Sequence, residues 1–168
     1  QWYPLYEQVY LQAQNRWQPL TAAALCNMKA QLGESMLFRA YFWNTQLVGF
    51  SVAIVDDEME AHLVGIDYAV NRQIYLYSRM LYDFVELGIQ KGVKQIVFGR
   101  TAVEIKSAMG AMPVYYGNVL RHSRSIPNLF VKWMTQSLDY EIEDMRAPWK
   151  GELEREIKER LQPGMMHE

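Results

Sequence analysis

The chain has 168 residues, half of them hydrophobic, which excludes an intrinsically disordered protein. It carries 17 lysines and arginines against 19 aspartates and glutamates, and the formal net charge of −2 argues against a generic nucleic-acid binder. The single cysteine, Cys26, excludes an internal disulfide framework and a cysteine-based zinc cluster, and we expect no metal. We find neither a signal peptide nor an apolar run of membrane-spanning length, and expect a soluble, cytoplasmic protein.

The chain begins at Gln1 and its first methionine is Met28, so we expect it to be a piece of a longer protein. Its length predicts one domain. We place this domain at residues 1–140 and assign residues 141–168 to a charged, helical C-terminal extension.

The first half of the chain changes from helical to strand-like patterning. The expected elements are helices over residues 5–16 and 20–32, a hairpin of strands 36–43 and 47–55 joined by residues 44–46, and a third strand over about 60–67. The most regular helical pattern follows over 73–90, with Asn71 as its candidate N-cap and Gly92 at its end. Residues 94–98 then read as a buried strand. A strand, a long helix and a second strand form a crossover, so we expect the strands at 60–67 and 94–98 to be parallel.

The second half begins with a predicted capping box, in which Thr101 and Glu104 open a helix that runs to Met109. We expect three further elements: a strand over 114–121, a helix near 127–138 and a charged helix near 151–161. The fold class predicted from this order is α+β with a mixed sheet.

Positive charge gathers between Lys91 and Lys132, where seven basic residues face one acid and the segment carries +6. The basic residues are Lys91, Lys94, Arg100, Lys106, Arg121, Arg124 and Lys132. This segment is either an anion-binding region or a solvated basic face. The junction Gly99-Arg100-Thr101 favours the first interpretation, because a strand-to-helix turn presents backbone N–H groups to an anion, and Lys106 supplies a second cation.

Other candidate residues lie near the third strand. Asp67 ends that strand, and ligands gather beyond the carboxyl ends of parallel strands. Tyr77 is one of several tyrosines that could protonate a leaving group, although core packing is the more common role. His62 and Cys26 lack spaced partners, so we expect packing or surface roles for both.

The order of helices and strands resembles the GNAT-like acyl-CoA N-acyltransferase fold over roughly residues 5–138, without the strand that normally opens that fold. The stretch from Phe98 to Ala111 also resembles the FemABX-like branch, in which a strand and a glycine precede a helix that carries a lysine. The resemblance implies an N-acyltransferase, with acetyl-CoA or another acyl-CoA as donor and a small-molecule or peptidyl amine as acceptor. It also implies a tandem domain or a homodimer.

The resemblance assigns roles to particular residues. Lys106 occupies the lysine position and would contact phosphate or the developing oxyanion, while Asp67 or Tyr77 would manage protons. The turn that holds the CoA pyrophosphate corresponds to residues 68–73, which include Asn71 and Arg72 but lack the usual glycine-rich loop. The phosphate-binding residues would then be Asn71, Arg72, Arg100 and Thr101.

Two alternatives stay open. The donor could be aminoacyl-tRNA, as in the peptidoglycan enzymes of the FemABX-like branch, for which the basic segment at 91–132 is suitable. The chain could also be a non-catalytic, GNAT-like half that supports a partner domain.

Overall fold

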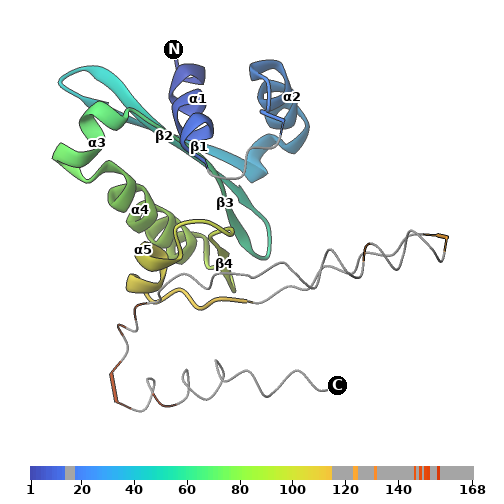
Figure 1. Ribbon diagram of the computed structural model, residues 1–168, viewed down its shortest axis with the longest axis vertical. Helices are drawn as coiled ribbons and strands as arrows, with labels where there is room; N and C mark the ends of the chain where they lie inside the picture. The colour runs from blue at the N-terminus through green and yellow to red at the C-terminus, as the bar shows by residue number, and fades with distance from the viewer. Residues whose placement is uncertain are drawn as a thin grey trace. The chain divides into compact units, whose positions relative to one another are not determined.

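The structure is a computed structural model that describes residues 1–13, 18–114, 123–124, 131, 146, 148, 150–151 and 155. Contacts within the chain form two compact units, Gln1–Arg100 and Thr101–Glu168 (Figure 1). The expected strand beyond Val114, both later helices and nearly all of the extension 141–168 lie outside the described residues. The domain boundary at residue 140 therefore stays a prediction.

The first unit is an α+β fold, as the sequence predicts. Its strands are β1 (Met36–Trp43), β2 (Gln46–Val55), β3 (Met59–Ile66) and β4 (Ile96–Val97). They form one sheet in the order β1-β2-β3-β4, in which β1, β2 and β3 are antiparallel and β4 is parallel to β3. The predicted hairpin and the predicted parallel pair are both confirmed.

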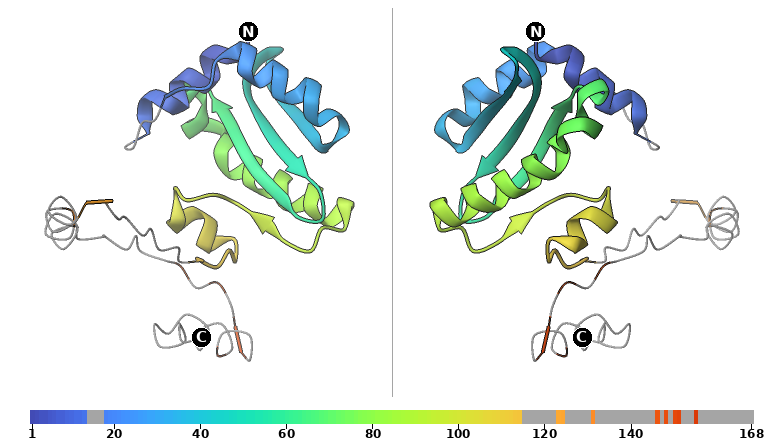
Figure 2. Two further views of the ribbon diagram at one scale, coloured as in Figure 1. Left: turned by 90° about the vertical axis from the view of Figure 1, so that its right-hand side faces the viewer. Right: turned by 90° about the vertical axis from the view of Figure 1, so that its left-hand side faces the viewer.

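Helices cover both faces of this sheet (Figure 2). One face carries α1 (Tyr3–Gln12) and α2 (Ala22–Leu32), which bury Leu5 and Leu25 against Phe50 of β2. The other face carries α4 (Leu76–Lys91), whose Phe84 packs against Ala53 of β2. Because β2 is buried on both faces, its sequence is an almost continuous apolar run.

A close approach of α4 to the sheet depends on Gly49 of β2. A Cβ atom at this position would lie 2.5 Å from Met80 Cε, 2.9 Å from Leu76 Cδ2 and 3.0 Å from the carbonyl oxygen of Gly65. A larger residue would force the side chains of Met80 and Leu76 to shift and would crowd the Gly65 carbonyl. Gly49 is therefore a packing requirement of the interface between α4 and β2.

The predicted helix over 73–90 is wrong in its N-terminal part. Two helices occupy this stretch, α3 (Tyr68–Ile74) and α4, and Tyr75 between them has φ 51° and ψ 41° in the left-handed region. The N-cap of α4 is Tyr75 and not the predicted Asn71, but Asn71 Oδ1 accepts a hydrogen bond of 2.9 Å from Tyr77 N in the first turn of α4. It does so from within α3, where a side chain can fold back onto the next helix.

The predicted capping box at Thr101 and Glu104 is also wrong. The helix α5 (Val103–Ala108) belongs to the second unit and begins after Ala102, with no side-chain hydrogen bond at its N-cap. Glu104 is instead paired with Arg146, whose Nε donates to Glu104 Oε1 at 3.0 Å. The N-cap is Ala102 rather than Thr101, so Glu104 is the second residue of α5 and not the third, where a capping box places its acid.

Candidate functional site

Among the described residues, the outer edge of β3 has a strand partner at two positions. Strand β4 pairs with β3 only at Met59 and Glu60, although β3 continues to Ile66. Within the part of the chain that the structure describes, no strand pairs with residues 61–66 on this side. Main-chain N–H and C=O groups at such an edge can bind an extended ligand as a further strand would.

The same stretch of β3 contains a β-bulge. Val52 of β2 lies opposite Leu63, and the next residue, Ala53, lies opposite Ala61, so His62 is the extra residue. A bulge redirects a side chain and bends its strand, and bulges are common next to active sites. The open edge and the bulge make this part of β3 the candidate site.

The carboxyl end of β3 brings together four residues that the sequence singles out. Asp67 is the N-cap of α3, where its Oδ1 accepts a hydrogen bond of 3.0 Å from Ala69 N. The Asp67 carbonyl oxygen accepts a second hydrogen bond, of 3.0 Å, from Asn71 N. The Asn71 side chain in turn accepts a hydrogen bond from Tyr77 N. Arg72 lies in the last turn of α3 and is exposed. Asp67 and Asn71 therefore form hydrogen bonds that stabilise the start of α3 and of α4. Arg72 supplies the positive charge at this end of β3.

The phenol of Tyr77 is partly buried in the cluster formed by Val48, Ile66 and Met80. Burial, together with the neighbouring Tyr68, raises the pKa of Tyr77 to about 12. Such a phenol is a weaker proton donor than an exposed tyrosine and is poorly matched to protonating a thiolate. The environment of Tyr77 therefore favours packing, and its catalytic role stays a prediction.

The predicted anion site around residue 100 is divided between the two units. Arg100 ends the first unit and Thr101 begins the second, and both are exposed. Since the capping box is absent, Thr101 does not organise the N-terminus of α5. The binding roles of Arg100 and Thr101 stay predictions.

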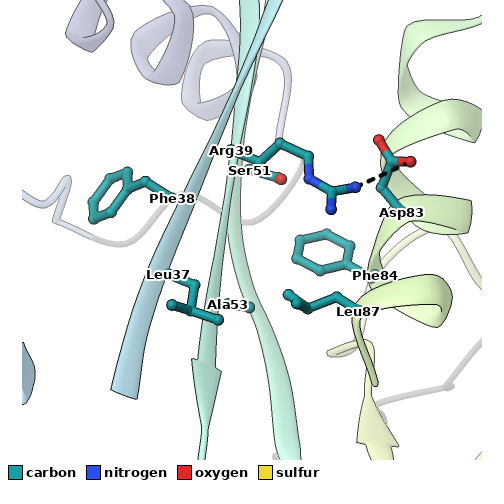
Figure 3. A pocket seen from close by; sticks show the side chains of 8 residues that line it. All are labelled: Leu37, Phe38, Arg39, Ser51, Ala53, Asp83, Phe84 and Leu87. Atoms are coloured by element: carbon teal, nitrogen blue, oxygen red, sulfur yellow. Dashed lines mark ion pairs between the residues drawn. The ribbon is translucent and has the colours of Figure 1, made fainter. Parts of the chain in front are cut away.

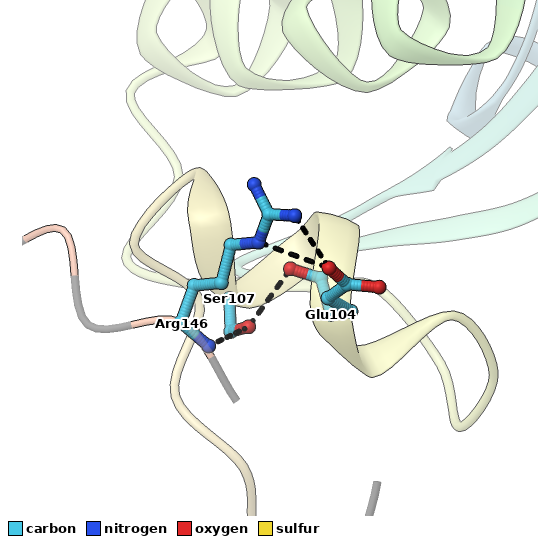
Figure 4. A network of polar contacts seen from close by, with 3 residues as sticks. All are labelled: Glu104, Ser107 and Arg146. Atoms are coloured by element: carbon cyan, nitrogen blue, oxygen red, sulfur yellow. Dashed lines mark hydrogen bonds and ion pairs between the residues drawn. The ribbon is translucent and has the colours of Figure 1, made fainter. Parts of the chain in front are cut away.

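Lys106 lies in α5 and is only 7% exposed, so it is not the solvated cation that a surface phosphate site would use. Next to it, Ser107 donates a hydrogen bond of 2.9 Å to the carbonyl oxygen of Glu104 and accepts one of 2.9 Å from Arg146 N (Figure 4). These contacts hold residue 146 against α5. The role of Lys106 at an oxyanion or a phosphate stays a prediction.

The basic segment 91–132 is less available than its charge suggests. Lys94 pairs with Asp57 at 2.9 Å, and Lys106 is buried. Arg121 and Lys132 lie outside the described residues. Part of the +6 charge is thus already compensated or withdrawn from solvent.

A second polar cluster, which sequence reasoning missed, lies between β1, β2 and α4 (Figure 3). Asp83 is 4% exposed and receives Arg79 Nε at 2.9 Å and Arg39 Nη1 at 3.2 Å. Nearby, the Tyr41 hydroxyl lies 3.2 Å from Ser51 Oγ, and burial is the main cause that raises the pKa of Tyr41 to about 12. In the sequence, this cluster could have been found from Asp83, because a carboxylate stands there next to the apolar face of the long helix.

This cluster borders a hollow of about 50 Å³ lined by Leu37, Phe38, Arg39, Ser51, Ala53, Asp83, Phe84 and Leu87. Ligand pockets usually measure roughly 300–1,000 Å³, so this hollow has room for water rather than for a cofactor. Both arginines are already paired with Asp83, which leaves little attraction for an added anion. We interpret the cluster as a link between the sheet and α4.

Sequence reasoning also missed the pairing of His62 with Glu60, whose Nδ1 and Oε1 atoms lie 2.9 Å apart. Spacing of two residues along a strand places two side chains on one face, but the bulge that affects His62 has no signal in the sequence. Only the register between β2 and β3 shows it.

No group of three or more metal-ligating side chains occurs in the described part of the chain. Among the same residues, no helix combines the length and the apolar character needed to cross a bilayer. Comparison with known proteins finds no matching family model, no matching curated protein and no matching solved structure.

Proposed function

We propose that this chain is part of an N-acyltransferase that moves an acyl group from acyl-CoA to an amine. The observation that carries the proposal is the parallel pair β3–β4, which is joined at two positions and then leaves the bulged edge of β3 open. Two reactants held together at one edge react much faster than in solution, because their encounter no longer costs translational entropy. A ligand lying along this edge would meet both the main chain and the side chains at the bulge.

The element order supports the same assignment. Two helices, three antiparallel strands, a helical crossover and a parallel fourth strand are compatible with the GNAT-like fold without its first strand. Acyl-CoA has an extended arm with amide groups, and amides can pair with the open N–H and C=O groups of residues 61–66. The acyl thioester would then lie beside the bulge.

The phosphates of CoA need a different binding mode from the glycine-rich turn of typical family members. Residues 68–74 form the short helix α3 instead of such a turn. Arg72 on this helix is exposed and has no ion-pair partner among the described residues, so it is our candidate phosphate contact. The amine acceptor and a tandem or dimeric arrangement are parts of the same proposal.

Isothermal titration calorimetry of the full chain with acetyl-CoA tests this function. We expect saturable binding, and we expect Arg72→Ala to weaken it about tenfold, in line with the loss of one charged hydrogen bond of about 1.4 kcal/mol. Lys150→Ala is the matched control, because Lys150 is an exposed cation outside the basic segment 91–132, and it should leave binding unchanged. Absence of binding at about 1 mM ligand would overturn the acyl-CoA proposal.

The two alternatives predict different results. An aminoacyl-tRNA donor requires tRNA binding that weakens steeply as salt is added, because phosphate contacts release counterions. A non-catalytic half requires that acetyl-CoA has no measurable affinity for the chain. No described contact favours either alternative over acyl-CoA.

A further inference from the structure

One side of α4 is apolar and yet exposed to solvent. The helix packs on the sheet through its opposite side, with buried residues such as Met80 and Phe84 (Figure 2). Tyr75, Tyr82 and Ile89 follow one another at intervals of seven residues, and their exposed fractions are 74%, 62% and 75%. Side chains seven positions apart lie on one stripe of a helix, about two turns from each other. This exposed stripe therefore runs along α4 from its N-cap to its last turn.

A row of smaller residues borders the exposed stripe. Ser78, Val85 and Gly92 each follow a residue of the stripe by three positions. A Cβ atom added at Gly92 would have no heavy atom within 4 Å, so the end of this row is open. The two rows have the a and d spacing with which one helix of a coiled coil packs against another. Because the larger side chains are all in one row, the kind of helix that fits is restricted.

An antiparallel helix of the same sequence matches the two rows. It places the row of smaller residues of one copy opposite the exposed stripe of the other. The facing pairs are Tyr82 with Val85, Ile89 with Ser78, and Tyr75 with Gly92. Each level of the interface then holds one large and one smaller side chain, which fills space at the density of a protein interior. A parallel pair would bring the large side chains against their own copies and leave gaps between the smaller ones.

The charges beside the exposed stripe are complementary in the same arrangement. Arg79 and Glu86 border the stripe on one side, and their side chains are 67% and 53% exposed. In the antiparallel pair these borders face each other, so Arg79 of one copy lies within reach of Glu86 of the second copy, twice around the two-fold axis. Arg79 pairs with Asp83 through Nε, and a guanidinium carries further donors for a second carboxylate.

We propose that the exposed stripe of α4 binds the same stripe of a second copy of this chain, with the two helices antiparallel. The inference goes beyond acyl transfer, because it names the surface through which the chain dimerises, and acyl-CoA binding does not depend on it. The helix has 16 residues and is about 24 Å long. A pair of such helices is small for a protein interface, so we expect a dissociation constant of roughly 10 μM.

Sedimentation velocity of the full chain between about 1 and 200 μM tests the proposal, and we expect a reversible monomer–dimer equilibrium. Tyr82→Lys should raise the dissociation constant at least about 30-fold, because it places a charge at the centre of the interface in both copies. Ile89→Lys is a second variant at the end of the stripe, and both residues are exposed, so circular dichroism should show a native fold. Phe42→Thr is the matched control: Phe42 is 65% exposed on β1, and its loss should leave the constant unchanged. Monomer at every concentration, or a dimer that persists in both lysine variants, would overturn the proposal.

Glu86→Lys tests the antiparallel order. The introduced charge would face Arg79 of the second copy, so we expect the dimer to weaken about fivefold at low salt and to recover above about 0.5 M salt. Glu58→Lys is the matched control, since it makes the same change of charge in the exposed turn before β3 and should not affect the dimer. In a parallel pair Glu86 would not lie beside Arg79 of the second copy, so an unchanged constant would contradict the proposed interface.

Acetyl-CoA calorimetry distinguishes this proposal from the proposed function. A native chain that binds acetyl-CoA but stays monomeric overturns only the dimer. A dimer that has no affinity for acetyl-CoA overturns only the acyl-CoA function.

Discussion

At the scale of single residues, Asp83 shows how a buried charge is accommodated. Asp83 is 4% exposed and forms ion pairs with Arg79 of its own helix and Arg39 of β1, so it joins α4 to the edge strand of the sheet. Both arginines remain partly in water, with side-chain exposures of 67% and 38%. The burial cost therefore falls mainly on Asp83, and the two ion pairs offset it.

We expect Asp83→Asn to lower the free energy of unfolding by about 1.5–3 kcal/mol, because it removes the buried carboxylate charge that pairs with two arginines. Urea denaturation followed by circular dichroism measures this change. Glu86→Gln is the matched control, since Glu86 lies 3.7 Å from the same Arg39 but its side chain is 53% exposed. Its effect should stay below about 1 kcal/mol, and equal effects of the two substitutions would contradict the burial argument.

At the scale of secondary structure, the β1–β2 hairpin contains a local strain. The predicted three-residue link is in fact a two-residue turn, because Gln46 already pairs with Trp43. Asn44 and Thr45 have φ values of 47° and 67°, the pattern of a type I′ turn. Asparagine tolerates this region, but a β-branched residue there is an outlier, and glycine is the residue that such turns prefer.

We therefore expect Thr45→Gly to raise the free energy of unfolding by up to about 1 kcal/mol, since relief of the left-handed strain exceeds the added flexibility of glycine. Thr45→Ala is the control: it also removes the threonine hydroxyl but keeps a Cβ in the left-handed region. The measurement is thermal or urea unfolding of both variants. A glycine variant less stable than the alanine variant would show that the turn is not strained.

Helix boundaries illustrate why local patterns fail at particular residues. The apolar positions of 73–90 continue through the break at Tyr75, so periodicity alone cannot separate α3 from α4. At the break, Tyr75 adopts the left-handed region, and Asn71 Oδ1 accepts a hydrogen bond from Tyr77 N across it. For α5, the Thr-x-x-Glu pattern is present in the sequence, but the helix begins one residue later, with Ala102 as its N-cap.

At the scale of the whole molecule, the core clusters formed by the described residues belong to the first unit. These three clusters contain buried residues such as Val52, Met80 and Phe84, and their surrounding described partners extend no further than Phe98. Each cluster combines the sheet with a helix. We therefore expect Gln1–Arg100 to fold cooperatively by itself.

We expect residues 1–100, expressed alone, to unfold in one cooperative urea transition with retained far-UV circular dichroism. A matched fragment of residues 1–92 lacks β4 together with Val93, Ile96 and Phe98, which complete the third cluster. It should unfold at lower urea, because Phe84 and Met59 lose apolar cover. A gradual transition in the longer fragment would show that the first unit depends on the rest of the chain.

Local patterns in the sequence were sufficient for several elements. The apolar residues before Gly33 predicted α2, and the apolar run predicted β2. The strand–helix–strand order predicted the parallel pair β3–β4, because a crossover of this kind joins parallel strands even though they lie far apart in the chain. The sequence also singled out Asp67, Asn71 and Arg72, which do lie together at the end of β3.

Only the tertiary structure decided the contacts that join distant positions. The bulge at His62 exists because β2 and β3 pair in one register, and the burial of Asp83 exists because α4 packs beside Arg39 of β1. Both depend on strands and helices coming together, which no single stretch of sequence encodes. His62 was therefore visible as a histidine in the sequence, but its bulged position and its buried Nε2 only in the fold.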